Sequence, residues 1–174
     1  MPADATPALL AYAAYILWLI AGLCDFLCHR HTDLPRTSGL AESSLHLLQL
    51  ALIGGGIVLA LAFDASAALA VTLCIVALAH AVSGYLDTRS AFPKRVILPV
   101  EQHVHSVLDM APLIALFLWL VANWPAIADG GGFHLRQPAL PLAIWLAMLA
   151  PAALLCALPA ALEFRAAWAC RHVA

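Results

Sequence analysis

Five long apolar stretches, separated by short polar connectors, make up nearly the whole chain. They cover residues 8–28, 40–63, 67–86, 100–124 and 139–164. At a rise of 1.5 Å per residue, a helix of about twenty residues crosses roughly 30 Å of hydrocarbon. Because open irregular backbone cannot face lipid, the pattern predicts an all-α fold, an integral membrane bundle of about five transmembrane helices. We expect residues 1–174 to form a single domain, since neither a linker nor a repeat divides them.

Composition agrees with a membrane protein and excludes several functions. Hydrophobic residues make up 64% of the chain and charged residues 10%, with a mean hydropathy of +0.95. A net charge of −2 gives no indication of nucleic-acid binding. The first residues lack the basic region of a signal peptide, so we expect the first apolar stretch to be kept as a span. The five cysteines, mostly in apolar runs, predict no disulfide framework.

Basic residues mark one set of connectors and so predict an orientation. They cluster in the first and third connectors and in the C-terminal tail, at Arg30, Arg36, Arg89, Lys94, Arg95, Arg165 and Arg171. The second connector has none, and the fourth has only Arg136. The positive-inside rule then places the N-terminus outside and the C-terminus in the cytoplasm, in what we expect to be a bacterial inner membrane.

Each of the first four spans carries an acid and a histidine close to its predicted cytoplasmic end. A spacing of four residues, or of seven, keeps both side chains on one helical face. The sets are Asp25 with His29, Glu42 with His46, His80 with Asp87, and Glu101 with His105 and Asp109. Ionisable groups within a span are costly and need partners. Four sets at one depth predict a shared metal site, the alternative being pairs that only hold the helices together.

The ligand types narrow the choice of metal. Imidazoles mixed with carboxylates suit Fe, Mn or Zn better than Mg or Ca, and we prefer Fe. A site with two metal ions would use more of these candidate ligands than a site with one metal ion. Asp87 and Asp109 are either ligands or acceptors that orient a histidine, while Glu101 and Asp109 are also the candidate catalytic acids. We expect no ligand from the fifth span.

Four further residues near this layer have open roles. His103 lies two residues from His105 and faces away from it on a regular helix, which favours a place at the membrane interface. His31 lies in the first connector, where it is either solvent-exposed or closes the site. Cys24 and Cys28 flank Asp25, and we interpret them as small residues at a helix contact rather than as thiolate ligands. His134 and His172 fall outside the layer and receive no role.

Two resemblances follow from these motifs. The segments Asp25-x-x-Cys28-His29-Arg30, Glu42-Ser43-x-x-His46 and Glu101-Gln102-His103-x-His105 resemble a set of small bacterial multi-span membrane proteins without a settled activity. That resemblance covers roughly residues 25–112. The histidine-rich layer is also loosely similar to the membrane fatty acid hydroxylase and desaturase group, which uses di-iron for oxygen chemistry. The chain lacks the HxxHH boxes of that group, and carboxylates replace many of its histidines.

The leading functional hypothesis is a dinuclear metalloprotein acting as an oxidoreductase on a lipid-soluble substrate. A zinc-dependent lipid hydrolase, with Glu101 as general base, is the alternative enzyme. A haem b protein, with His46, His80 or His105 as axial ligands, is disfavoured by the many acids at the same depth. A metal-handling protein or a purely structural membrane protein completes the alternatives. The bilayer and a lipid-like substrate are the expected partners, and the redox partner and oligomeric state are undetermined.

Overall fold

The computed structural model describes residues 5–171, and these residues form an all-helical bundle. Its elements are α1 (Ala5–His31), η1 (Leu34–Arg36), α2 (Gly39–Ala62), α3 (Ala67–Ala91), α4 (Pro99–Ala122), α5 (Trp124–Ala128), α6 (Leu142–Ala152), η2 (Ala153–Ala157) and α7 (Leu158–Cys170). Within the described residues, five helical segments are long and apolar enough to cross a membrane. The predicted fold class is therefore confirmed.

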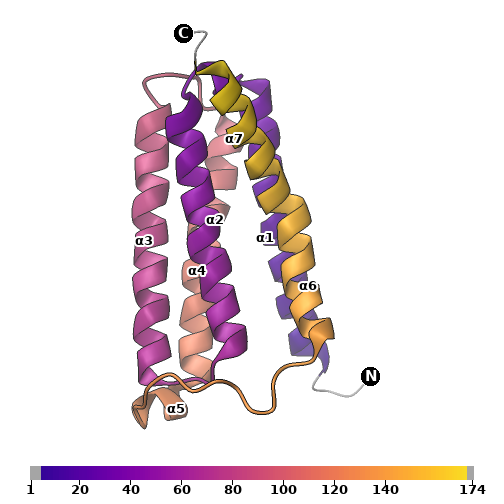
Figure 1. Ribbon diagram of the computed structural model, residues 1–174, viewed down its shortest axis with the longest axis vertical. Helices are drawn as coiled ribbons and strands as arrows, with labels where there is room; N and C mark the ends of the chain where they lie inside the picture. Colours follow the sequence, from indigo (N-terminus) through magenta and orange to yellow (C-terminus); the bar gives the residue numbers. More distant parts are fainter. Residues whose placement is uncertain (1–4, 172–174) are drawn as a thin grey trace.

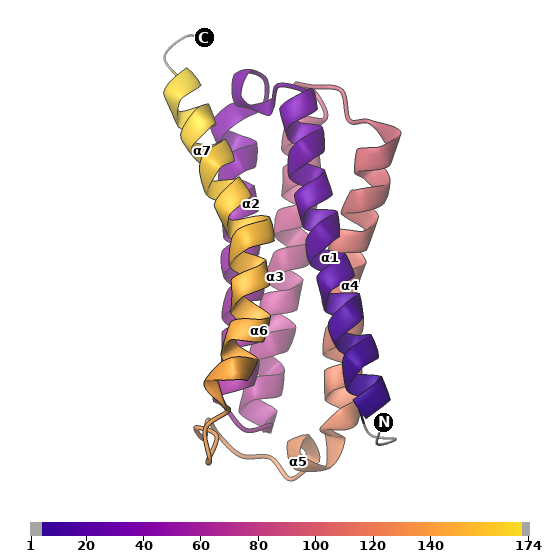
Figure 2. The same ribbon diagram turned by 90° about the vertical axis from the view of Figure 1, so that its right-hand side faces the viewer.

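The five spans pack side by side and alternate in direction (Figures 1 and 2). Around the bundle, α1 contacts α4, α4 contacts α3, α3 contacts α2, and α2 contacts α7. The segment from α6 through η2 to α7 closes the ring by also packing on α1. One end of the bundle therefore holds residues 32–38, residues 92–98 and the end of α7, and the other holds α5 and the loop before α6 (Figure 1).

Several helices extend further than the hydrophobic pattern indicates, chiefly at the end of the bundle that holds residues 32–38 and 92–98. α1 runs on to His31, α3 to Ala91 and α7 to Cys170, each beyond its apolar stretch. Hydropathy marks only the lipid-compatible part of a helix, whereas polar residues continue it when they find partners inside the bundle. α4 begins at Pro99, a residue suited to the first helical turn.

The prolines of the fifth span accompany a change in helix type. Between Pro151 and Pro159 the backbone is π-helical over Ala153–Ala157. A proline removes a backbone donor from the regular hydrogen-bonding ladder, and the irregular turn lies between two prolines.

At the opposite end, the glycine-rich connector is tied to the turn between α2 and α3. The Asp64 N–H donates to His134 O at 2.9 Å, and the Arg136 N–H donates to Ala62 O at 2.9 Å. Gly130 O accepts a hydrogen bond from the Ala67 N–H at 3.3 Å. These contacts hold the connector against the turn between α2 and α3, and they place His134 at the end remote from the acid and histidine layer.

Candidate metal centre

Buried polar side chains gather at the end of the bundle that holds residues 32–38 and 92–98. Each is at most 8% exposed, in a protein whose outward surface is mostly apolar. We call this group the polar cluster; it comprises Asp25, His29, Glu42, His46, His80, Asp87, Arg95, Glu101, His105 and Glu163. All five spans contribute, as does the α3–α4 connector. The structure thus brings together most of the predicted site residues and adds two that the sequence analysis did not assign to the site.

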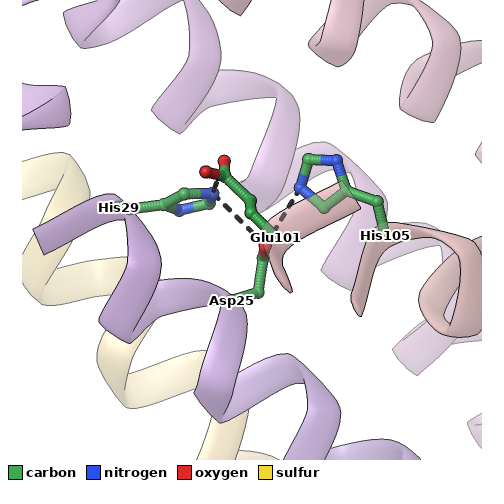
Figure 3. A group of neighbouring side chains, drawn as sticks. All are labelled: Asp25, His29, Glu101 and His105. Carbon is green, nitrogen blue, oxygen red and sulfur yellow. Dashed lines mark ion pairs between the residues drawn. The ribbon is translucent and has the colours of Figure 1, made fainter. Parts of the chain in front are cut away.

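The tightest part of the cluster lies between α1 and α4. Asp25 and His29 are one turn apart on α1, and Glu101 and His105 are one turn apart on α4 (Figure 3). Asp25 Oδ1 lies 3.0 Å from His105 Nε2, and Asp25 Oδ2 lies 3.3 Å from His29 Nε2. Glu101 Oε1 lies 3.5 Å from His29 Nε2. One donor atom from each of the four side chains lies within 4.8 Å of the others, so the group could hold a metal ion.

A second group shares His29 and involves α2 and α3. His29, Glu42 and His46 also offer donor atoms within 4.8 Å of one another. His46 Nε2 lies 4.0 Å from Glu42 Oε1 and 3.2 Å from Asp87 Oδ2. The second half of the cluster therefore contains its own imidazole and two carboxylates, with His29 between the two halves.

Glu163 of α7 connects the two halves and was missed by the sequence analysis. His29 Nδ1 lies 2.9 Å from Glu163 Oε2, and His46 Nδ1 lies 2.6 Å from Glu163 Oε1. An ionised carboxylate only accepts hydrogen bonds, so both Nδ1 atoms carry the proton and donate. In the neutral form of each ring the lone pair is then on Nε2, the nitrogen that faces the other carboxylates. A signal existed in the sequence, because Glu163 is the one carboxylate in residues 139–164, near the same end as the others.

Arg95 is the second residue that sequence reasoning misplaced. It was counted among the basic residues that set topology, but it is 8% exposed and reaches into the cluster. Its guanidinium donates to both carboxylate oxygens of Glu42 and to Glu101 Oε1, the latter at 2.5 Å. A further bond reaches Thr32 Oγ1 at 3.2 Å. Burial lowers the pKa of Arg95, but the hydrogen bonds to the two glutamates more than offset this and raise it above its ordinary value.

Charge in the cluster is not balanced by its own residues. Among the described residues, five carboxylates are buried there with one guanidinium. With neutral imidazoles, four negative charges stay uncompensated, which a low-dielectric interior does not tolerate. The rings of His29 and His46 stack at 4.5 Å with an interplanar angle of 3°, so two protonated rings would repel each other by about 4 kcal/mol at an effective dielectric constant of about 20. The carboxylate of Glu163, which contacts both rings, would offset part of that repulsion. Two divalent cations would supply the four positive charges that neutral imidazoles leave to be balanced.

Several buried nitrogen and oxygen atoms of the cluster, each able to bind a metal ion, make no hydrogen bond with a described residue. They include His29 Nε2, His105 Nε2, Asp25 Oδ1 and Asp87 Oδ1. Asp25 Oδ1 and His105 Nε2 lie 3.0 Å apart and pair with each other when the ring carries a proton on Nε2, whereas His29 Nε2 and Asp87 Oδ1 call for another partner. Three of the four belong to the tight group between α1 and α4. Imidazole nitrogens and carboxylate oxygens aimed at one point fit a transition-metal ion such as Fe, Mn or Zn.

Three of the predicted residues, His80, Asp87 and Asp109, lie outside these two groups, although Asp87 contacts His46. His80 lines a cavity in the bundle together with Asp25 and His46. Asp109 packs on Gly84 of α3, where an added Cβ would come within 2.7 Å of Asp109 Oδ1. Neither side chain belongs to the two donor groups described above.

The residues with open roles lie outside both donor groups. His31, His103 and Cys24 are exposed on the outside of the bundle, and Cys28 is half-buried. His103 thus faces away from His105, as a regular helix requires. His172 lies outside the described residues.

Comparison with known proteins leaves the family open. No protein-family model matches the chain, and neither a curated protein nor a solved structure is significantly similar to it. Of the features that the two sequence resemblances imply, the structure shows five apolar helices and a buried cluster of histidines and carboxylates.

Proposed function

We propose that this protein is a membrane-embedded, dinuclear metalloprotein and that its metal centre oxidises a lipid-soluble substrate. The observation that carries the proposal is that Asp25, His29, Glu101 and His105 are all buried and each offer a ligand atom within 4.8 Å of the others. From the basic connectors we place the centre near the cytoplasmic face of a bacterial inner membrane.

In this proposal the two halves of the cluster each hold one ion. Asp25, Glu101 and His105 hold the first, and Glu42, His46 and Asp87 hold the second, with His29 between them. Glu163 keeps the rings of His29 and His46 in the tautomer that can bind metal, as carboxylates behind ligating histidines commonly do. Arg95 fixes Glu42 and Glu101 and reduces their negative charge.

Oxygen chemistry fits this centre better than hydrolysis. When bound, a pair of iron ions supplies the means to activate oxygen, with electrons from a redox partner. A hydrolase needs a free carboxylate as general base, whereas Glu101, the candidate base, accepts a hydrogen bond from Arg95 at 2.5 Å and is weakened as a base. A haem with His46 as an axial ligand would need open space beyond Nε2 of that ring, but this atom lies 3.2 Å from Asp87 Oδ2.

Metal content and absorption of protein purified from its native membrane test this proposal. We expect roughly one to two transition-metal ions per chain. In iron-loaded protein, reduction followed by exposure to oxygen should change the visible absorption, while zinc-loaded protein should show no such change. Asp25→Asn should lose the metal, and Asp64→Asn, at the other end of the bundle, should keep it. A stable, metal-free wild-type protein with full activity would refute the metal proposal, and zinc alone would refute the oxidative one.

A further inference from the structure

A cavity lies in the middle of the bundle, directly beside the polar cluster. Its volume is about 330 Å³, and all five spans contribute to its wall, through residues that include Trp18, Gly54, His80, Leu108, Leu149 and Cys156. Asp25 and His46 border it, so the cavity reaches the cluster. The cavity is partly open to the outside of the bundle, so it is a cleft between the helices rather than a sealed void.

A second cavity of about 290 Å³ adjoins the first. The two share Trp18, Ile53 and Ile57 in their walls, and the second extends the space along α2, α3 and α4 toward the opposite end. We call the two together the chamber. Its wall is apolar except where it meets the cluster and at Gln49, and it contains neither lysine nor arginine among the described residues. Phosphate or another anionic headgroup would therefore find no counter-charge inside.

One polar atom in the chamber wall indicates what the occupant must offer. Trp18 Nε1 is buried and has no acceptor among the described residues. An indole N–H only donates, and a buried donor without an acceptor is costly. Trp18 precedes Asp25 by seven residues on α1, which separates them by about 10 Å along the helix axis. An occupant with an acceptor oxygen at Trp18 would thus extend over about 10 Å to reach the cluster.

The backbone of the fifth span is irregular where it borders this space. Ala153, Cys156 and Ala157 of the π-helical segment line the first cavity. π-helical turns are rare and occur frequently at functional sites. Here the small side chains of the irregular turn leave open a volume that a regular helix with larger residues would fill.

The three consecutive glycines of α2 have three different surroundings. An added Cβ at Gly56 would lie 3.4 Å from Val76 Cγ1, so this glycine allows close packing against α3. Gly54 faces the first cavity, and Gly55 faces outward; a Cβ at either position would meet no atom within 4 Å. Gly54 and Gly55 are therefore neighbours on one helix that differ in whether an added side chain would enter the chamber.

From these observations we infer that the chamber binds the substrate of the metal centre as a neutral, single-chain lipid. Its acceptor oxygen, as in an ester, an alcohol or a ketone, accepts from Trp18, and its apolar chain lies along the chamber to Asp25 and His46. Because the described wall contains neither lysine nor arginine, it offers no counter-charge to an anionic headgroup, and the two adjoining cavities suit one chain. This inference rests on the proposed function only for the oxidation of the lipid chain at the metal centre.

Binding of a spin-labelled methyl stearate, a neutral single-chain ester, tests the inference in phosphatidylcholine vesicles. Wild-type protein should immobilise the nitroxide, and unlabelled methyl stearate should displace it. Gly54→Leu should weaken this binding by about tenfold or more, because a hydrophobic pocket discriminates strongly against lost space. Gly55→Leu, the matched control, should bind within twofold of wild type. Equal binding by both variants, or equal loss in both, would overturn the inference.

A second variant keeps the test decisive if Gly54→Leu does not fold. Trp18→Phe removes the indole donor and should weaken binding of the ester by about two- to tenfold, the range of one net hydrogen bond. It should leave binding of a spin-labelled alkane unchanged, and Trp124→Phe, which alters an exposed tryptophan, should affect neither probe. If spin-labelled phosphatidylcholine is immobilised as strongly as the ester, the occupant is bulk lipid and the inference fails.

The outcome is separable from that of the proposed function. Binding of the ester should persist in metal-depleted protein, so loss of the metal proposal would leave this result standing. In Mn²⁺-loaded protein, the bound nitroxide should show paramagnetic broadening that is absent with Zn²⁺, since the chain ends beside the cluster. Binding without broadening would place the chain away from the metal and refute its assignment as substrate.

Discussion

Replacing Glu163 with glutamine tests how the histidines of the cluster are oriented. In the wild-type protein the two oxygens of Glu163 accept from the Nδ1–H groups of His29 and His46, at 2.9 and 2.6 Å. The glutamine amide has one oxygen and one NH₂ group, so it can accept from only one ring. The other ring must then present its Nδ1 lone pair and move its proton to Nε2. That nitrogen can no longer bind a metal ion.

The expected loss of metal affinity follows from this change of tautomer. Removing a carboxylate behind a ligating histidine typically costs 10–100-fold in metal affinity. At 25 °C this corresponds to about 1.4–2.7 kcal/mol of binding free energy. Because Glu163 orients two rings at once, we expect a value toward the upper end. Glu163→Asp keeps the charge and both acceptors on a shorter side chain, so it should recover part of the affinity.

Competition with a chromophoric chelator measures this affinity in detergent-solubilised protein. Arg165→Gln is the matched control, because Arg165 is exposed and lies two residues away on the same helix. Circular dichroism would show that both variants keep their helices. The reasoning is refuted if Glu163→Gln binds metal within about twofold of the wild type, or if Arg165→Gln loses as much affinity as Glu163→Gln.

Three further predictions concern other parts of the cluster. His105→Ala should lower the metal content by more than roughly tenfold, the cost of losing a residue that only supports a ligand. His103→Ala should leave the metal content unchanged. Elemental analysis that finds equal losses in both variants would contradict the orientation of these two side chains on α4. Arg95→Gln should destabilise the protein by about 3–5 kcal/mol in denaturant unfolding, since it leaves Glu42 and Glu101 buried without their partner; Lys94→Gln, at an exposed neighbour, should change it by at most about 0.5 kcal/mol. An ion present at 100 times its dissociation constant stabilises by about 2.7 kcal/mol, so a chelator should lower the unfolding midpoint of wild-type protein but not that of His105→Ala.

The sequence alone determined the number and type of the helices. Length and hydropathy define five spans, because a chain that crosses a bilayer must satisfy its backbone internally. The helical period of 3.6 residues places acids and histidines four apart on one face, so Asp25 with His29 and Glu101 with His105 could be recognised as pairs without coordinates. Alternation of direction puts such pairs at one depth. These inferences need only local geometry.

Only the tertiary structure decided which pairs meet and what completes them. The rotation of each helix about its axis and the order of helices around the ring depend on side-chain packing between spans, which no local period encodes. That packing brings Asp25 to His105, leaves His80 at a cavity wall, and directs Glu163 from α7 to two rings on different helices. From the sequence, Arg95 is interpreted as one of the basic residues that set the orientation in the membrane. The fold instead buries Arg95, because the buried carboxylates of Glu42 and Glu101 need a cation beside them.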